Sequence, residues 1–301
     1  MSLAIALSIL LTVLCFFAER QWEISYHSRY IIKSDDIQPN VSYLLDSDNV
    51  NILNGNIMRL SKWKNRFSIL TTIIVKYNPE IITVQEAELD QCNDIIKKFP
   101  GYSFTGSGRY GRNEGDGCFI FFQKKRFHLI DSGVFWLSST PHEPSITWDH
   151  KWSGMPRNVS WGILGDRKGR TLFVICTHFD GDSVVQQKSM KLILQKLSIN
   201  SPAGPVILAG DFNTGKTSKT YDMALTRFYD PWEKLGSLDF NKPTYHAFNG
   251  IRVREGENID WILLSKQPPI TKPLEAKIIR DSEGEQYPSD HFLTYVKFIF
   301  H

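Results

Sequence analysis

The chain has 301 residues, 42% of them hydrophobic and 13% aromatic, so it can bury a core as one large α/β domain or two small ones, and disorder as its main state is excluded. Thirty-five Lys and Arg against 32 Asp and Glu leave a net charge of +3, too small a field for a general nucleic-acid binder. Four cysteines without a C-x-x-C pair argue against a disulfide framework and a structural zinc site.

The N-terminus carries an uncharged apolar run from Leu3 to Ala18. As a helix this run would be about 24 Å long, shorter than a hydrocarbon core of roughly 30 Å. It suits the apolar region of a secretory signal, although the basic start and the good cleavage site of such a signal are missing. We therefore predict a signal peptide or short membrane anchor over 1–20 and a polar stalk over 21–40, which places the protein outside the cell or on a membrane.

Residues 41–301 alternate between helix-like and strand-like patterns. Apolar side chains at three- and four-residue steps predict a helix over 63–77, and the short buried strand IITVQEA follows it. A second helix-like run is QQKSMKLILQKL, and further strand-like runs are CFIFFQ, RTLFVICTHFD, PVILAGDFN, NIDWILLS and FLTYVKFIF. This alternation predicts one mixed α/β sandwich domain over 41–301.

The segment from Gly210 to Thr217 spells G-x-x-x-x-G-K-T, the pattern of a nucleotide-binding P-loop. Asp211 follows the first Gly, where its carboxylate would face phosphate oxygens at a cost of about 4 kcal/mol at 4 Å and an effective dielectric of 20. A P-loop also needs an acid that closes a later apolar strand, whereas Asp260 precedes the apolar part of NIDWILL. We therefore interpret GDFN as the acid and amide of a metal-dependent phosphodiesterase.

Acids, amides and histidines recur at the ends of the predicted strands. A hard divalent cation prefers carboxylate, amide and water oxygens and leaves positions open for substrate phosphate. The chain supplies such a set in Asn51, Glu86, His178, Asp180, Asp211, Asn213, Asp260, Asp290 and His291.

The order of these motifs resembles the endonuclease/exonuclease/phosphatase superfamily, whose members are deoxyribonuclease I-like, and is closest to its uncharacterised bacterial-type members. The resemblance begins near Asn51 and passes through WKNR, QEA, DSGVFWLSSTP, PRNVSW, THFD, GDFN, IDWIL and YPSDHF. It implies a four-layered sandwich of two packed mixed β-sheets flanked by helices. It also implies a phosphodiesterase, nuclease or phosphatase that depends on Mg²⁺, with Mn²⁺ as a substitute.

The resemblance assigns the metal to Glu86, Asn51 and Asp290. Asn54 and Leu44 are alternatives to Asn51 at the first ligand position, because the first strand could also lie in SYLLDSD.

The resemblance also assigns the chemistry. Asp211 would orient or deprotonate the attacking water beside Asn213, and His291, oriented by Asp260, would contact the phosphate. His178 would be a second phosphate donor. Arg157 and Asp180 are candidates for substrate binding, although both could be exposed charges.

The substrate class stays open between nucleic acid, a lipid head group and a small phosphoester. Basic groups at 97–98, 124–126, 167–170 and 252–254 fit either a phosphate backbone or solvated turns. Gly181 stands where relatives with THLDH carry a further histidine, so a contact made there is missing. This departure leaves one alternative, a catalytically weak or inactive membrane-tethered binding domain of the same fold. A monomer is assumed.

Overall fold

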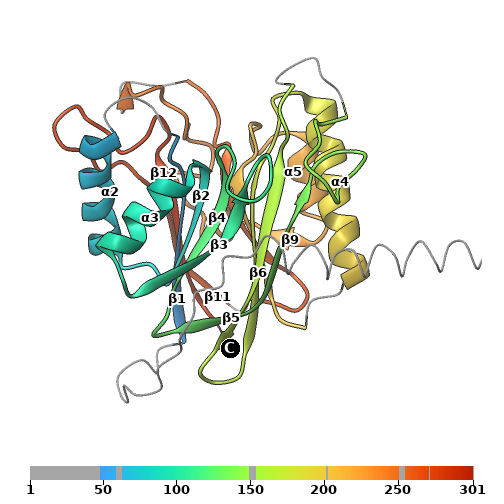
Figure 1. The fold of residues 1–301 in the computed structure, drawn as a ribbon, viewed down its shortest axis with the longest axis horizontal. Coiled ribbons are helices and arrows are strands. Elements are labelled where there is room, and N and C mark those ends of the chain that lie inside the picture. The colour runs from blue at the N-terminus through green and yellow to red at the C-terminus, as the bar shows by residue number, and fades with distance from the viewer. Residues whose placement is uncertain are drawn as a thin grey trace, which may run out of the picture.

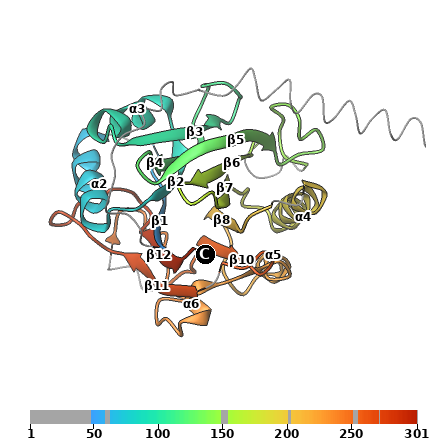
Figure 2. The ribbon, with the colours of Figure 1, turned by 90° about the horizontal axis from the view of Figure 1, so that it is seen from below.

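The structure is a computed structural model that describes residues 48–58, 63–148, 154–200, 203–250, 255–270 and 272–300. Two six-stranded mixed sheets lie face to face, with helices α2 and α3 on the outer side of one and α4 and α5 on the outer side of the other (Figures 1 and 2). The predicted four-layered sandwich of two mixed sheets flanked by helices is confirmed.

The first sheet has the order β11-β12-β1-β2-β4-β3, and the second has the order β5-β6-β7-β8-β10-β9. The strands of the first sheet are β1 (Asn49–Asn56), β2 (Ile81–Ala87), β3 (Tyr102–Gly108), β4 (Gly117–Gln123), β11 (Lys272–Ile279) and β12 (Leu293–Ile299). The strands of the second are β5 (Phe127–Trp136), β6 (Asn158–Asp166), β7 (Thr171–His178), β8 (Val206–Asp211), β9 (Phe228–Tyr229) and β10 (Asp260–Ser265). The helices are α2 (Trp63–Tyr77), α3 (Leu89–Lys98), α4 (Ser183–Asn200), α5 (Lys219–Ala224) and α6 (Pro231–Lys234).

Three apolar layers hold the sandwich together. One lies between the two sheets and contains alternate residues of their strands, such as Ile52, Cys176, Ala209 and Ile262. The other two lie between each sheet and its own helices, one around α2 and α3 and one around α4. Successive residues of a strand face opposite sides of the sheet. The face of a polar residue therefore follows from the layer in which the apolar residues of the same strand lie.

The predicted helix over 63–77 and the second predicted helix correspond to α2 and α4, and the predicted strands correspond to β2, β4, β7, β8, β10 and β12. The remaining elements of the described chain were not predicted. Cys92, Cys118 and Cys176 are buried free thiols, as expected for a chain without a disulfide framework.

The predicted signal peptide or anchor over 1–20, the stalk over 21–40 and the alternative ligand Leu44 all lie outside the described residues. Within the described ranges, no helix is both long and apolar enough to cross a membrane. Secretion or membrane anchoring therefore stays a prediction.

The P-loop-like segment does not have a free lysine. The Nζ atom of Lys216 lies 2.8 Å from Oδ2 of Asp230, and the two side chains are only 1% and 0% exposed. The loop is thus anchored inside the fold by the residue that a P-loop would offer to a phosphate, which supports the rejection of the nucleotide-binding interpretation.

Candidate active site

Three neighbouring strands of the second sheet bring His178, Asp211 and Asp260 together. In the strand register His178 pairs with Asp211, and Asp211 pairs with Asp260. Each of the three lies two residues from a residue of the apolar layer between the sheets, namely Cys176, Ala209 and Ile262. Their side chains therefore point into the space between the two sheets, at the end where β7 and β8 finish and β10 begins.

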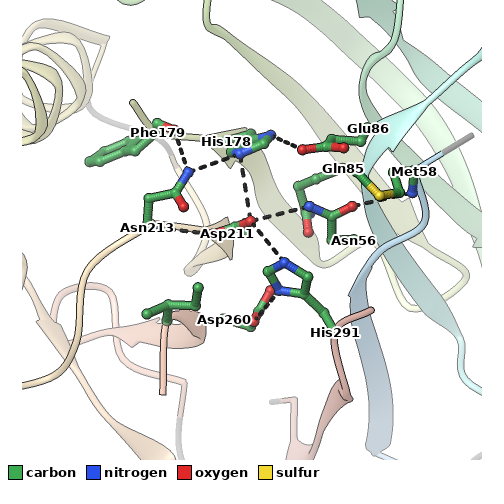
Figure 3. Close-up of polar contacts among 12 residues, drawn as sticks. Asn56, Met58, Gln85, Glu86, His178, Phe179, Asp211, Asn213, Asp260 and His291 are labelled. Carbon is green, nitrogen blue, oxygen red and sulfur yellow. Dashed lines mark hydrogen bonds and ion pairs between the residues drawn. The ribbon is translucent and has the colours of Figure 1, made fainter. Parts of the chain in front are cut away.

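Asp260 orients His291, as the resemblance implied. Nδ1 of His291 lies 2.9 Å from Oδ2 of Asp260, and both residues are buried (Figure 3). Burial alone would lower the pKa of His291, but the carboxylates of Asp260 and Asp211 overcome it and raise that pKa to about 10. The imidazole is therefore a cation at neutral pH, and its Nε2 lies 3.8 Å from Oδ2 of Asp211.

Asp211 lies at the centre of the site (Figure 3). Its Oδ1 accepts the backbone N–H of Asn213 at 2.9 Å, and its Oδ2 accepts Nδ2 of Asn56 at 3.2 Å. Burial, together with the charge of Asp260, raises the pKa of Asp211 to about 6, although the charge of His291 opposes the shift. The carboxylate is therefore ionised at neutral pH and is basic enough to accept a proton from water.

His178 is held as a neutral imidazole. Nδ2 of Asn213 lies 3.0 Å from Nε2 of His178 and also donates to the carbonyl of Phe179 at 2.9 Å. Because an amide nitrogen only donates, Nε2 accepts and the proton lies on Nδ1, which is 3.7 Å from Oε1 of Glu86. Burial, together with the positive charges of Arg157, Arg109 and His291, holds the pKa of His178 well below its ordinary value of 6.5.

Glu86 enters the site through an unusual backbone conformation. Strand alternation along β2 places Ile81 in the layer between the sheets and Val84 in the outer layer, so an even-numbered residue such as Glu86 should point away from the site. Its φ of 54°, at a register shift between Val84 and Ala87, turns it toward His178 instead. Burial and the charges of Asp116 and Asp290 raise the pKa of Glu86.

Asn51 does not lie in this cluster, whereas Asn56 does. Asn51 lies five residues before the end of β1, its odd-numbered neighbour Leu53 packs against the outer layer, and its Oδ1 accepts the hydroxyl of Tyr295. Asn56 ends the strand beside β2 and is buried between Glu86 and Asp211 (Figure 3). The alternative Asn54 lies beneath the site, where its Oδ1 accepts Thr83 and Gln85 at 2.8 Å each.

Asp290 reaches the site on the loop before β12. Its carboxylate raises the pKa of Glu86, so the two acids lie within electrostatic range of each other. Arg66 of α2 fixes this loop, because it donates to the carbonyl of Pro288 at 3.0 Å and to that of Met58 at 2.7 Å. The WKNR motif thus ties the loop that carries Asp290 to the segment that follows β1.

Arg157 and Asp180 are both buried, so the alternative that they are exposed charges is wrong. Arg157 lines a small recess of about 10 Å³ with Arg109, Glu86 and His178, and its Nε and Nη1 have no hydrogen-bond partner within the described ranges. Burial and the charge of Arg109 lower the pKa of Arg157. Asp180 accepts the backbone N–H of Asp182 at 3.1 Å in the turn after β7, and its charge acts on Arg157.

Two groups of side chains in the described part of the chain could take a cation. One atom each of Asp211, Asp260 and His291 lie within 4.8 Å of one another. There, however, Nδ1 of His291 is already bonded to Asp260, and the protonated imidazole supplies the positive charge. Glu86 and Asp290 lie within electrostatic range of each other, and carboxylate oxygens suit a hard divalent ion. The pair Glu86 and Asp290 therefore fits a metal ion better than the group of Asp211, Asp260 and His291.

No role was predicted from the sequence for four residues that build the site, Asn56, Gln85, Arg66 and Arg109, although Gln85 and Arg66 stand in the motifs QEA and WKNR. Asn56 and Gln85 pair across the parallel strands β1 and β2, so the rule that parallel strands end at one edge could have found them once the end of β1 was known. Gln85 bonds Oδ1 of Asn54 at 2.8 Å. The paired guanidinium of Arg109, bound to Asp116, carries no signal in a single sequence.

Comparisons with known proteins agree with this fold. Residues 49–291 match the model of the Endonuclease/Exonuclease/phosphatase family. A solved family protein from Bacteroides thetaiotaomicron is 26% identical with a TM-score of 0.75, over 84% of this chain and 98% of that one. A mannosyl-6-phosphatase from the same species is 26% identical with a TM-score of 0.74, over 83% and 100% of the two chains.

A curated relative is the CCR4-Not complex 3'-5'-exoribonuclease subunit Ccr4 of Candida albicans, which is 22% identical over 299 residues, or 79% of this chain and 37% of the relative. The chain spans about two thirds or less of the length of the curated relatives that it matches, between 37% and 66%.

Proposed function

The chain belongs to the Endonuclease/Exonuclease/phosphatase family, and we propose that it is a divalent-metal-dependent hydrolase of small phosphate esters. The resemblance found in the motifs is confirmed, and phosphoester hydrolysis is the activity common to the family. The observation that carries the proposal is the convergence of Asp211, Glu86, His178 and His291 at one end of the space between the sheets.

Each residue has a role in this proposal. Glu86 and Asp290, with the Asn56 amide beside them, would hold Mg²⁺, or Mn²⁺ as a substitute. When bound, the ion would supply Lewis-acid chemistry that offsets charge gained in the transition state. Asp211 orients the attacking water and accepts its proton, because its carboxylate is ionised above about pH 6.

His291 and His178 each carry a hydrogen-bond donor in the site, Nε2 of His291 on the Asp211 side and Nδ1 of His178 on the Glu86 side. Nε2 of His291 donates to a phosphate oxygen and is kept protonated by Asp260. Nδ1 of His178 is a second donor, whose tautomer Asn213 fixes. Arg157, with Asp180 in electrostatic range, offers unpaired N–H groups to an anionic substrate. Positioning and charge stabilisation supply most of the catalysis in such phosphoryl transfers.

The distribution of basic residues favours a small substrate over a long nucleic acid. Lys97 and Lys98 end α3, 124–126 follow β4, and 167–170 precede β7, all at the end of the sheets opposite to Asp211. Lys168 and Arg170 are also paired with Asp48, at 3.0 and 2.8 Å. These three groups therefore form no phosphate-binding track to the active site; the fourth predicted basic group, at 252–254, lies outside the described residues. The mannosyl-6-phosphatase likeness supports the same choice.

The test measures hydrolysis of p-nitrophenyl phosphate and bis(p-nitrophenyl) phosphate by the full chain, with Mg²⁺ and with EDTA. We expect Glu86→Gln and Asp211→Asn each to lower the rate by roughly 10²–10³-fold. The exposed residues Glu143 and Asp131 give the matched controls Glu143→Gln and Asp131→Asn, which should keep wild-type rates.

Mg²⁺ should also raise the melting temperature of the wild type and not that of Glu86→Gln, because a ligand that binds only the folded state stabilises it. Undiminished activity in EDTA, or in both active-site variants, would reject the proposal. A nucleic-acid substrate held through 6–10 phosphates would lose affinity on the order of 10³–10⁵-fold between 50 and 200 mM salt. A small ester should show a change of only a few fold.

A further inference from the structure

A polar cavity lies at the end of the first sheet opposite to the active site. Its volume is about 140 Å³, and the residues that line it include Asn51, Glu80, Gln123, Lys125, Arg126 and Lys297. A single water needs only about 10–15 Å³ by this measure, so the cavity can admit a small molecule. Asn51 and Asn56 are separated by five residues of β1, or roughly 16 Å at 3.3 Å per residue, so the cavity is distinct from the active site.

The charges around the cavity favour an anion. Lys125, Arg126 and Lys297 contribute three positive charges against the single carboxylate of Glu80. Arg126 is buried with its guanidinium 5.7 Å from the ring of Phe127, so its charge is fixed in place. Among the described residues neither Lys125 nor Lys297 is within ion-pair distance of an acid, although the charge of Lys125 acts on Glu80. Lys125 and Arg126 belong to the basic group at 124–126, which the proposed active site does not use.

The cavity also offers hydrogen-bond acceptors. Gln123 is 3% exposed, and its Oε1 has no hydrogen-bond partner among the described residues. Its orientation is fixed, because Nε2 donates to Oδ1 of Asn78 at 3.0 Å and to the carbonyl of Pro79 at 2.9 Å. Glu80 accepts the backbone N–H of Asn51 through Oε2 at 2.7 Å, which fixes its carboxylate. Acceptors of this kind bind ligand hydroxyl groups.

We propose that this cavity binds a small hydroxylated oxyanion, such as a polyol phosphate or a sugar acid. The oxyanion contacts the cations, and its hydroxyl groups donate to Gln123 and Glu80. A bare anion leaves the acceptor of Gln123 unpaired, and a neutral polyol leaves the two lysines without a counter-charge. The ligand therefore needs both kinds of group.

The test uses the full metal-free chain, with binding followed by calorimetry and by the backbone amide NMR signals of Gln123 and Lys125. Gluconate and glycerol 3-phosphate are the probes, and the tighter of the two identifies the oxyanion. Sorbitol and acetate carry only one of the two kinds of group and should bind at least about tenfold more weakly, since 1.4 kcal/mol corresponds to a factor of ten.

The variant Lys125→Met with Lys297→Met should weaken the saturable shift of the Gln123 signal at least tenfold. The matched control is Lys188→Met with Lys191→Met, two exposed lysines of α4, which makes the same change in net charge and should bind as the wild type does. Lys125 is exposed, so Lys125→Met alone serves if the pair of changes lowers stability. No saturable shift in the wild type, equal binding of sorbitol or acetate, or unchanged binding by the lysine variants would overturn the proposal.

Discussion

Replacing Lys216 by Met should destabilise the fold strongly. The ammonium of Lys216 lies 2.8 Å from Asp230, in a pocket where the rings of Trp232 and Phe240 are 4.5 and 4.8 Å away. Asp230 also accepts the hydroxyl of Tyr221 at 2.8 Å. With the lysine gone, its carboxylate stays buried without a counter-charge. Removing one partner of a buried ion pair costs about 3–5 kcal/mol in the free energy of unfolding.

Urea unfolding followed by circular dichroism measures this cost. Lys219→Met is the matched control, because Lys219 is exposed three residues along the chain and its loss should change stability by less than about 0.5 kcal/mol. The double variant Lys216→Met with Asp230→Asn should recover part of the loss, since it removes the unpaired charge. If Lys216→Met were no more destabilising than Lys219→Met, the ion pair would not hold the loop as described.

Asn56→Ala should lower the rate of phosphoester hydrolysis by roughly 10²-fold in a kinetic assay, whereas Asn51→Ala should leave it within a few fold. Equal effects of the two variants would contradict the assignment of Asn56, and not Asn51, to the metal site. Asp260→Asn should lower the pKa of His291 from about 10, which NMR of the metal-free imidazole reports. The pKa of His291 in the folded protein lies above its unfolded value of about 6.5. The contribution of the protonated His291 to the free energy of unfolding is therefore complete below about pH 6.5 and is lost as the pH rises through about 10. Wild-type stability to urea should therefore fall over that window, and a parallel fall in Asp260→Asn would contradict the assignment. Gly210→Ala should reduce the yield of folded protein measured by size-exclusion chromatography, because its Cβ would lie 2.2 Å from the carbonyl oxygen of Thr177, and a normal yield would contradict the close approach of β7 and β8.

The sequence could predict the second-sheet half of the site better than the first-sheet half. Each of its three residues stands at the start or the end of an apolar run, namely His178, Asp211 and Asp260. Such a residue lies at the end of its strand even if the predicted boundary of that strand is wrong by one position. Predicting the first-sheet half, which carries the proposed metal ligands, required the register of β1. Asn51 and Asn56 are an odd number of residues apart and so face opposite layers. That register is set by pairing with β2 and β12, which a single sequence does not contain.

The backbone departs from regular geometry at two residues of the site itself. Glu86 has a φ of 54° and Asn213 a φ of 50°. Asn adopts this left-handed region readily, but for Glu it costs on the order of 1–3 kcal/mol, which the buried residues on either side of Glu86 must offset. With regular alternation, the side chain at position 86 would point toward α2 and α3, where a hydrophobic residue would fit. The irregularity instead places a carboxylate beside His178, so the residue that strand periodicity assigns to the wrong face is the one that the proposed metal site most needs.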